Sequence, residues 1–438
     1  MSFFKKINVK KLVLYLFLFI LVFGITFVVS YICLPCDYDE IWLYGFSFNI
    51  SKGLVIYRDF NVVTTPLYYM IGSLFIKIFG NYIIVMGVFN SILVAFIFLM
   101  MFRVISYKAF IVFPLILIFY PNGYNLLCLF WLMLILLLVI NKKDDDILVA
   151  FILGLLFITK QNIGLCLLIP YLYYSKKKIK GLICFFVPFV LVSIYLIYNN
   201  AFYEFIDYCF LGMLDFGTGN SYFCIFSIIE IFVLGYLIFL LLKSKFCDKE
   251  VFYILMFQIM LLPLSDPYHF FVSFFPVTYY IVKKMKNQFI LIWLFFIILL
   301  SNIYLFFVVD HEVYENNDIL YLKNCGDLPV LMNELHEYLD GIDYYYFVNY
   351  YGYLYKLYYD IPITQYDLWN EGNMGYKGLE KRINEVSEMC EEKQCLFFVD
   401  GDWNKNGQSQ IIKFADYIVN NYEFVEEFHT FLIYSNNK

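Results

Sequence analysis

Long apolar segments, separated by short polar ones, fill most of the chain before residue 310. Many of them approach the ~20 residues that an α-helix needs to cross the hydrocarbon core of a bilayer. Because lipid offers the backbone no hydrogen-bond partner, such segments predict membrane-spanning helices. We expect eleven spans, at residues 12–32, 81–102, 109–121, 123–140, 147–159, 163–174, 181–198, 223–242, 251–264, 270–282 and 289–309.

After residue 309 the pattern changes, and charged and polar residues become frequent. Short apolar runs typical of strands alternate there with segments of helical periodicity, which predicts a small α/β domain. The expected order is a strand at 344–348, a helix at 379–393, a strand at 396–399, a helix at 410–421 and a strand-like run at 424–434. The chain therefore divides into a membrane domain, residues 1–309, and a soluble domain, residues 310–438.

Composition supports a polytopic α-helical membrane protein. Only 16% of the residues are charged and 62% are hydrophobic, whereas soluble proteins carry about a quarter charged residues. The first apolar run, 12–32, is too long for the apolar region of a signal peptide, so we expect an uncleaved first span. The net charge is -6 and no long basic tract occurs, which excludes nucleic acid as an expected partner.

Lysine and arginine predict the orientation, because loops on the cytoplasmic side carry an excess of both. With the N-terminus inside, the predicted inside loops hold most of the basic residues of the membrane domain. The predicted outside loops hold only Lys52, Arg58, Lys77 and Lys160. Eleven spans then place the C-terminal domain on the extracytoplasmic side of the plasma membrane.

Three predicted outside loops carry candidate chemistry. The first, residues 33–80, contains amphipathic stretches at 41–52 and 67–79 that we expect to lie in the membrane interface. The second covers 199–222 and the third 265–270. Their acids are Asp37, Asp39, Glu40, Asp59, Glu204, Asp207, Asp215 and Asp266. Carboxylates here could accept a proton from a hydroxyl or bind a divalent cation, and each could equally be a solvated loop charge.

Cations near these loops could pair with a lipid phosphate. Arg58, Lys160 and His269 are the candidates. Lys160 could instead be a lysine that extends its ammonium group from a span end into water, and His269 an ordinary interfacial aromatic. The sequence shows no cluster of the zinc-binding type, so no metal or other cofactor is expected, and a divalent cation stays open.

Two cysteine pairs lie in segments predicted to face an oxidising space. They are Cys33 with Cys36 and Cys390 with Cys395. Closely spaced cysteines can be redox active or bind metal, and they can also be ordinary thiols or a local disulfide. The sequence leaves these alternatives open.

The first outside loop carries a motif series. It reads Asp39-Glu40, then Gly53-x-x-x-Tyr57-x-Asp59, then Thr65-Pro66-Leu67-x-Tyr69, and ends with Phe79-Gly80. Its order and spacing resemble the GT-C superfamily of membrane glycosyltransferases, in the branch of the protein O-mannosyltransferases and the aminoarabinose transferase of lipid A. Thr65 departs from the family, which has a proline there. The stretches from Lys160 to Gly164 and from Asp266 to His269 are similar to later elements of the family.

The resemblance implies an enzyme that moves a sugar from a polyprenyl-phosphate carrier to an extracytoplasmic acceptor with inversion at the anomeric carbon. Asp39 would be the general base and Glu40 would position it or the acceptor. Lys160, helped by Arg58 and His269, would bind the donor phosphate. The supporting residues would be Asp37, Tyr57, Asp59, Gln161 and Asp266. Asp37 is a rival for the base. The expected partners are the lipid-linked sugar donor, membrane lipid and an acceptor that is a glycan, a lipid or a protein of the cell envelope.

Two other functions fit an extracytoplasmic membrane protein of this composition. A transporter or flippase would carry charges at matched positions of inverted repeats, and the sequence offers only Glu230 within a predicted span. A non-catalytic assembly protein for lipid-linked glycans would keep the fold without needing Asp39 for activity.

Overall fold

The computed structural model describes two compact units. The described residues are 9–32, 38–118, 123–140, 146–215, 225–262, 267–287, 290, 293, 328–342, 344–348, 351–367, 369, 373–401 and 409–436. The first unit comprises residues 1–34, 84–191 and 222–311. The second comprises residues 35–83, 192–221 and 312–438. The predicted first and second outside loops thus belong to the same unit as the C-terminal residues.

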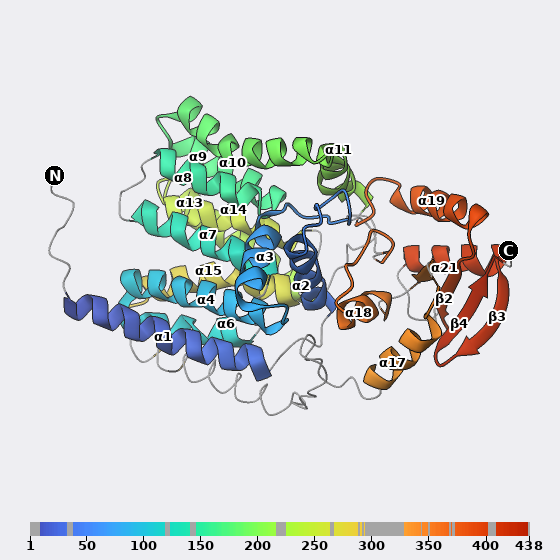
Figure 1. The fold of residues 1–438 in the computed structure, drawn as a ribbon. Coiled ribbons are helices and arrows are strands. Elements are labelled where there is room, and N and C mark those ends of the chain that lie inside the picture. Colours follow the sequence, from blue (N-terminus) through green and yellow to red (C-terminus); the bar gives the residue numbers. More distant parts are fainter. Residues whose placement is uncertain are drawn as a thin grey trace. The chain divides into compact units, whose positions relative to one another are not determined.

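Helices form the described part of the first unit, as Figure 1 shows. They are α1 (Val9–Ile32), α4 (Ile84–Ile105), η1 (Ser106–Lys108), α5 (Ala109–Val112), α6 (Pro114–Ile118), α7 (Gly123–Ile140), α8 (Asp146–Phe157), α9 (Gln161–Tyr174), α10 (Lys178–Tyr198), α13 (Ile225–Lys243), α14 (Lys249–Phe257), η3 (Gln258–Leu261) and α15 (Pro267–Lys284). Helix α10 continues past residue 191 into the second unit.

Helical segments occur at each of the first ten predicted spans, and almost all of the eleventh, 289–309, lies outside the described residues. Four described helices are long and apolar enough to cross a membrane: Val9–Tyr31, Ile84–Val112, Gly123–Ile140 and Lys178–Tyr198. The second of these joins two predicted spans, because the expected loop 103–108 continues the helix through η1. The chain is therefore a mostly helical membrane protein, and the count of eleven spans stays a prediction.

The first part of the second unit comes from the two long outside loops. It contains α2 (Tyr38–Ser51), α3 (Leu67–Phe79), α11 (Phe202–Ile206) and η2 (Asp207–Leu211). Helices α2 and α3 lie at the two stretches predicted to be helical, 41–52 and 67–79. They pack through the ring of Phe46, which meets the ring of Tyr69 edge-on at 5.3 Å between centroids.

The expected amphipathic character is wrong for α2, because Ile41 and the residues from Leu43 to Asn49 are buried, so that no polar face of the helix from Ile41 onward meets water. The expected place of both helices in the membrane interface stays a prediction.

The C-terminal residues of the second unit form a small α/β domain, as predicted. Its elements are α17 (Leu328–Tyr338), β1 (Tyr345–Phe347), α18 (Tyr351–Tyr358), α19 (Gly378–Glu392), β2 (Leu396–Asp400), α21 (Ser409–Asn421), β3 (Glu423–Phe428) and β4 (Phe431–Ser435). The sheet order is β1-β2-β4-β3, with β1 parallel to β2 and the other pairs antiparallel. The prediction of one strand over 424–434 is wrong, because the chain turns at His429, whose φ of 53° is left-handed.

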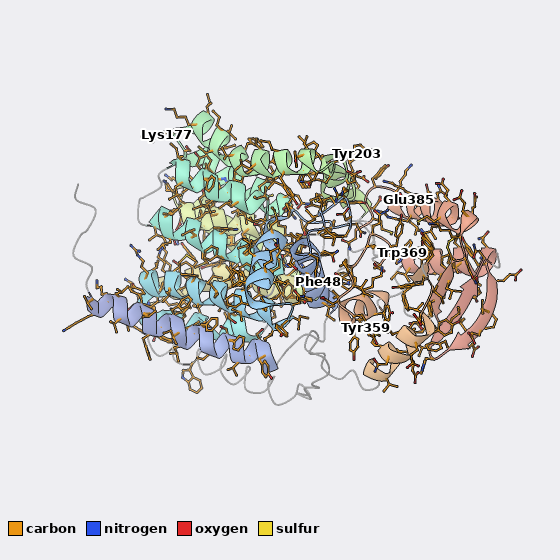
Figure 2. The ribbon with its side chains drawn as sticks, in the orientation of Figure 1. Phe48, Lys177, Tyr203, Tyr359, Trp369 and Glu385 are labelled. Atoms are coloured by element: carbon orange, nitrogen blue, oxygen red, sulfur yellow. A yellow bond between two sulfur atoms is a disulfide. The ribbon has the colours of Figure 1, made fainter. Side chains whose placement is uncertain are left out.

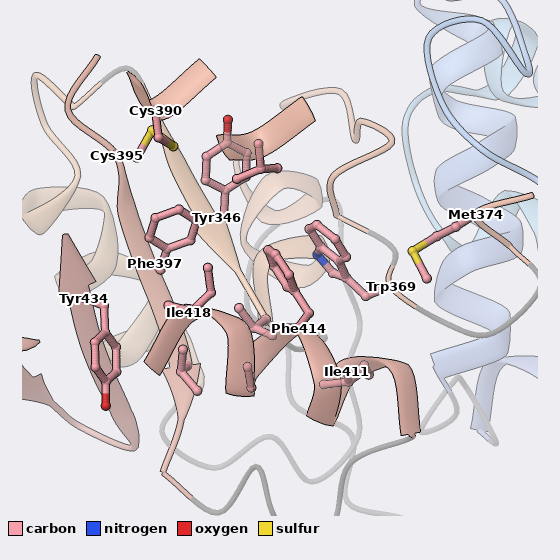
Figure 3. Close-up of a cluster of buried hydrophobic side chains, with 14 residues drawn as sticks. Tyr346, Trp369, Met374, Cys390, Cys395, Phe397, Ile411, Phe414, Ile418 and Tyr434 are labelled. Atoms are coloured by element: carbon pink, nitrogen blue, oxygen red, sulfur yellow. A yellow bond between two sulfur atoms is a disulfide. The ribbon is translucent and has the colours of Figure 1, made fainter. Parts of the chain in front are cut away.

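Strand β2 is buried on both faces of the sheet, because its residues point alternately to opposite sides and Leu396 to Val399 are all buried, whereas the edge strand β3 is exposed. On one face Phe397 packs with Ile418 and other side chains of α19 and α21, and Figure 3 shows Trp369 stacked on Phe414 at 3.8 Å between centroids. On the other face Phe398 stacks on Phe347 at 4.6 Å. Aromatic residues therefore supply much of this core, in which each ring buries a large apolar area.

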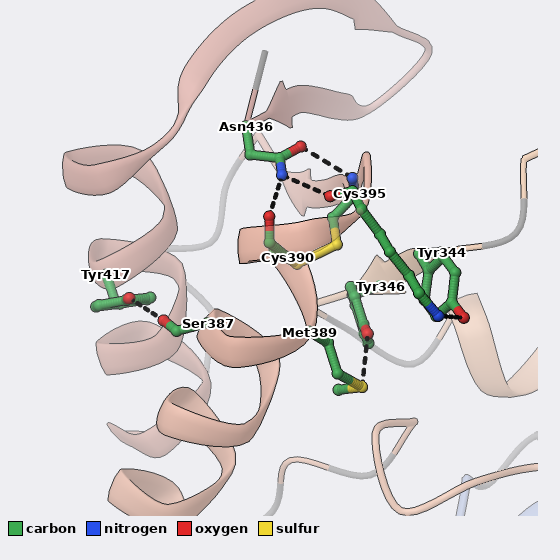
Figure 4. Close-up of a disulfide and its surroundings, with 9 residues drawn as sticks. Tyr344, Tyr346, Ser387, Met389, Cys390, Cys395, Tyr417 and Asn436 are labelled. Carbon is green, nitrogen blue, oxygen red and sulfur yellow. Dashed lines mark hydrogen bonds between the residues drawn. A yellow bond between two sulfur atoms is a disulfide. The ribbon is translucent and has the colours of Figure 1, made fainter. Parts of the chain in front are cut away.

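A disulfide joins Cys390 to Cys395 at the turn between α19 and β2, with 5.6 Å between the Cα atoms (Figure 4). The side chain of Asn436 accepts a hydrogen bond from the Cys395 N–H at 2.9 Å and donates to the carbonyls of Cys390 and Lys393. Of the alternatives left open by the sequence, this pair is a local disulfide. Cys33 and Cys36 lie outside the described residues.

Orientation can be tested with a membrane-impermeant maleimide on cells. Cys247 is a free, exposed thiol at the turn between α13 and α14, which is rich in lysine. We expect it to react only after the cells are opened, because the excess of basic residues places this turn in the cytosol. Mass spectrometry of the purified protein would report the labelled residue.

The matched control is Tyr203→Cys. Tyr203 is 75% exposed in α11 of the second outside loop and is labelled in Figure 2. A cysteine there should react in intact cells. Labelling of Cys247 in intact cells, with protection of the cysteine at 203, would reverse the predicted orientation.

Candidate functional site

Several helix ends of the first unit bring polar side chains together. Tyr124 and Asn125 lie in the first turn of α7, Lys160 directly precedes α9, Met260 lies in η3, and His269 lies in the first turn of α15. Helices α7, α8 and α9 follow one another through short connections, so the start of α7, the end of α8 and the start of α9 share one end of the bundle. This is the end that the charge pattern places outside.

Three side chains contact the ammonium group of Lys160 there. Its Nζ donates a hydrogen bond to Asn125 Oδ1 at 3.0 Å, lies 3.5 Å from Met260 Sδ and lies 5.2 Å from the centroid of the Tyr124 ring. Asn125 Nδ2 in turn lies 3.5 Å from His269 Nε2. Asn125 and His269 are 4% and 8% exposed. These contacts orient an ammonium group, a polar amide and an imidazole in a partly dehydrated setting, where a cation attracts a phosphate more strongly than in water.

The turn that carries Lys160 depends on a glycine. Lys160 is extended, with φ -152° and ψ 109°, and acts as the N-cap residue of α9. Gly164 in the first turn of α9 lies against α8, where a Cβ atom would stand 2.4 Å from Phe157 Cα. No side chain fits between these backbones. Gly164, four positions after Lys160, therefore allows α9 to pack closely against α8. This packing fixes the position of Lys160.

A test of this packing is Gly164→Ala. The new methyl group would meet backbone atoms of Phe157, which cannot rotate away, so we expect a loss of stability of about 1–3 kcal/mol. Thermal unfolding of the detergent-solubilised protein would measure it.

Gly235→Ala is the matched control, because Gly235 lies in α13 with nothing within 4 Å of its Cβ position. We expect that variant to be at least as stable as the wild type, since alanine favours a helix over glycine by roughly 1 kcal/mol. Equal stability of the two variants would contradict the close α8–α9 contact as the reason for Gly164.

In the second unit the predicted base lies at a helix start. The structure places Asp39 and Glu40 in the first turn of α2 and describes the side chains of this helix from Ile41 onward. A carboxylate in the first turn is stabilised by the helix dipole. Two other predicted residues, Asp37 and Asp266, lie outside the described residues.

Arg58 and Asp59 form a bidentate pair. Arg58 donates from Nε to Asp59 Oδ1 at 2.7 Å and from Nη2 to Asp59 Oδ2 at 2.9 Å, while the Val55 N–H also donates to Oδ2 at 2.7 Å. Partial burial raises the pKa of Asp59, but the hydrogen bonds from Arg58 and Val55 outweigh it, so the pKa lies below its usual value. Asp59 therefore stabilises the loop as an anion. A role of Arg58 at a donor phosphate stays a prediction, since its described contacts are Asp59 and the Asn199 carbonyl at 3.5 Å.

Tyr57 ties the first outside loop to the second. Its φ of 74° is left-handed, which is rare for a bulky residue, and its side chain is fully buried. The hydroxyl donates to the Thr64 carbonyl at 2.9 Å, and the ring lies 5.0 Å from the ring of Phe205 in α11. Burial raises the pKa of Tyr57, so it acts as a neutral hydrogen-bond donor. Its position favours a structural role.

Two acids of the second loop also have structural partners. Asp207 accepts a hydrogen bond from the Tyr376 N–H at 3.1 Å, and Asp215 accepts one from the Lys377 N–H at 2.7 Å. They hold the segment that leads into α19. No group of three or more histidine, cysteine or acidic residues that could hold a metal occurs within the described part of the chain.

The sequence pointed to Lys160, Gln161 and His269. It did not point to Asn125, which contacts both Lys160 and His269. Gln161 follows Lys160 in the chain and is buried, with 6% of its surface exposed. One signal for Asn125 was available: it is an amide in the first turn of an otherwise apolar span. Such a residue is costly in lipid unless it has a partner.

Comparison with known proteins shows similarity in fold. No family model matches the chain, and no curated protein matches it. The structure of ArnT from Cupriavidus metallidurans bound to undecaprenyl phosphate matches with a TM-score of 0.55 and 11% identity, over 98% of each chain. The structure of the same protein in the apo state matches with a TM-score of 0.56 and 12% identity, again over 98% of each chain. The predicted GT-C fold is therefore confirmed along nearly the whole chain.

Proposed function

We propose that this protein is a membrane glycosyltransferase that moves a sugar from a polyprenyl-phosphate carrier to an acceptor outside the cytoplasm. The observation that carries the proposal is the ammonium group of Lys160, held by Asn125 and Tyr124 at the end of a helix bundle. A protein of the same fold has been solved with undecaprenyl phosphate bound. A lipid-linked donor keeps its phosphate at the membrane surface, which is where a cation at a helix end can meet it.

Lys160 would act on the leaving group. When the bond between the anomeric carbon and the phosphate oxygen breaks, the electron pair leaves with the phosphate. A fixed cation beside that oxygen stabilises the growing negative charge without proton transfer. Lys160 is suited to this because the Asn125 amide and the Tyr124 ring orient its ammonium group at a helix end. His269, which contacts Asn125, would help to bind the phosphate, and Asp266 would orient His269.

Asp39 would act on the acceptor. Its carboxylate takes the proton of the acceptor hydroxyl as the oxygen forms a bond to the anomeric carbon. Attack on the face opposite the departing phosphate inverts the anomeric configuration. Glu40, the next residue in the first turn of α2, would position the base or the acceptor. Asp37 remains the rival base, and no step requires a metal ion.

The disulfide supports an extracytoplasmic C-terminal domain, because such bonds persist in oxidising compartments. The acceptor would accordingly be a glycan, a lipid or a protein of the cell envelope. A transporter for the same carrier is the alternative from another class. It would depend on charges inside the bundle, such as Glu230, which is 8% exposed in α13.

The substitution Asp39→Asn tests the base. Loss of a general base typically lowers the rate by a factor of about 10²–10⁴, so we expect sugar transfer from a polyprenyl-phosphate donor in isolated membranes to fall to that degree. Glu204→Gln, which neutralises an acid of α11 in the second loop, serves as the control and should keep its activity. Full activity of Asp39→Asn at normal expression would exclude Asp39 as the base and point to Asp37. Membranes in which the wild-type protein supports no sugar transfer would sink the proposal and favour a transporter or an assembly protein.

The substitution Lys160→Gln tests the donor cation. Removal of one charge-assisted contact to the phosphate in the transition state should lower kcat/KM for the donor by a factor of roughly 10². Lys77→Gln is matched to it, because Lys77 is an exposed lysine in the last turn of α3 and loses the same charge. A drop of equal size in both variants would mean that net charge, not a defined phosphate contact, governs the rate.

A further inference from the structure

Helix α2 is docked on the C-terminal domain through a buried amide pair. Asn49 Nδ2 donates to the Ile363 carbonyl at 2.7 Å, and the Ile363 N–H donates back to Asn49 Oδ1 at 3.1 Å. Asn49 is 0% exposed and Ile363 is 1% exposed. A displacement of the helix would leave four buried polar groups without hydrogen bonds, and each such group lowers the stability of the fold. The pair therefore specifies one position of α2 on this domain.

A second contact brings the backbone of α2 against an aromatic ring. The hydroxyl of Tyr353 in α18 donates to the Trp42 carbonyl at 3.1 Å. At Gly45, one turn along, a Cβ atom would stand 2.4 Å from that hydroxyl oxygen. The absence of a side chain at Gly45 lets the ring reach the helix surface. Together with Asn49, this contact holds α2 at two points along its length.

The loop that presents Ile363 is itself rigid. Asp367 accepts hydrogen bonds from Lys356 Nζ at 2.6 Å, from the Thr364 N–H at 2.6 Å and from Thr364 Oγ1 at 2.8 Å. The side chains of Lys356 and Asp367 are only 11% and 4% exposed. A buried, hydrogen-bonded ion pair of this kind fixes one geometry, because breaking it leaves a charge without compensation. Ile363 is therefore held by a network that belongs to the C-terminal domain alone.

We propose that the C-terminal domain positions α2, and with it the candidate base Asp39, through the Asn49–Ile363 pair. Asn49 is thus a positioning residue, and this inference rests on the proposed function. From Asn49 to Asp39 the helix runs about 15 Å, at 1.5 Å per residue. A tilt of about 5° at Asn49 would move the start of the helix by about 1 Å, and a misplacement of that size can lower a rate by roughly 10².

The test is Asn49→Ala in the full-length protein, with Ser51→Ala as the matched control. Ser51 lies in the same helix, and its Oγ donates only to the Phe48 carbonyl of its own turn, at 2.6 Å. Hydrogen exchange followed by mass spectrometry reports the docking of α2 without reference to activity. Transfer assays well below the unfolding temperature report kcat and the KM for the donor separately.

We expect the amides of α2 to exchange about tenfold faster in Asn49→Ala, because two buried hydrogen bonds are lost, while other helices keep their protection. We expect kcat to fall about tenfold or more with the KM for the donor within about twofold, since the base moves and the phosphate site does not. Ser51→Ala should change neither quantity.

Two results would overturn the inference. One is unchanged exchange of α2 in Asn49→Ala, which would show that the pair does not hold the helix. The other is faster exchange with unchanged kcat, which would show that the position of α2 does not govern the reaction. Failure of the proposed function is recognised separately, since the absence of any transfer by the wild-type protein, or full activity of Asp39→Asn, is read from the transfer assay, while hydrogen exchange still reports the docking of α2.

Discussion

The constraint behind this structure is that a backbone inside lipid must satisfy its own hydrogen bonds. Helices meet that demand, and they leave polar chemistry to their ends. Asn125, Lys160 and His269 all lie within a turn of a helix terminus, where the chain can turn and polar groups can meet water or a headgroup. The phosphate of a lipid-linked molecule lies at the same depth, at the membrane surface. The membrane thus restricts polar sites to the helix ends.

The cation at this boundary shows how local packing supports chemistry. Lys160 is fixed by the close approach of α8 and α9 at Gly164 and by a neutral amide, Asn125, from α7. These contacts give the ammonium group a defined position, and preorganised groups of this kind stabilise developing charge effectively.

The second unit is assembled from segments that are far apart in the sequence. The first outside loop contributes α2, the second contributes acids that hold the start of α19, and the C-terminal residues contribute the sheet and the loop around Ile363. The C-terminal residues consequently share one compact unit with segments of the first and second predicted outside loops. Tyr353 and the segment around Ile363 give the surface on which α2 is held.

The sequence by itself determined the helices of the membrane part, the two helices of the first loop and the α/β character of the C-terminal residues. These features follow from the spacing of apolar residues, which is local information. It missed the hairpin turn at His429, helix α17, and helix α18, in which every second or third residue is a tyrosine. It could not reveal that Asn49 pairs with Ile363, 314 positions away, or that Asn125 lies between Lys160 and His269. Only the tertiary structure decides such pairs, because a hydrogen bond between distant segments depends on how helices pack and leaves no periodic trace in the chain.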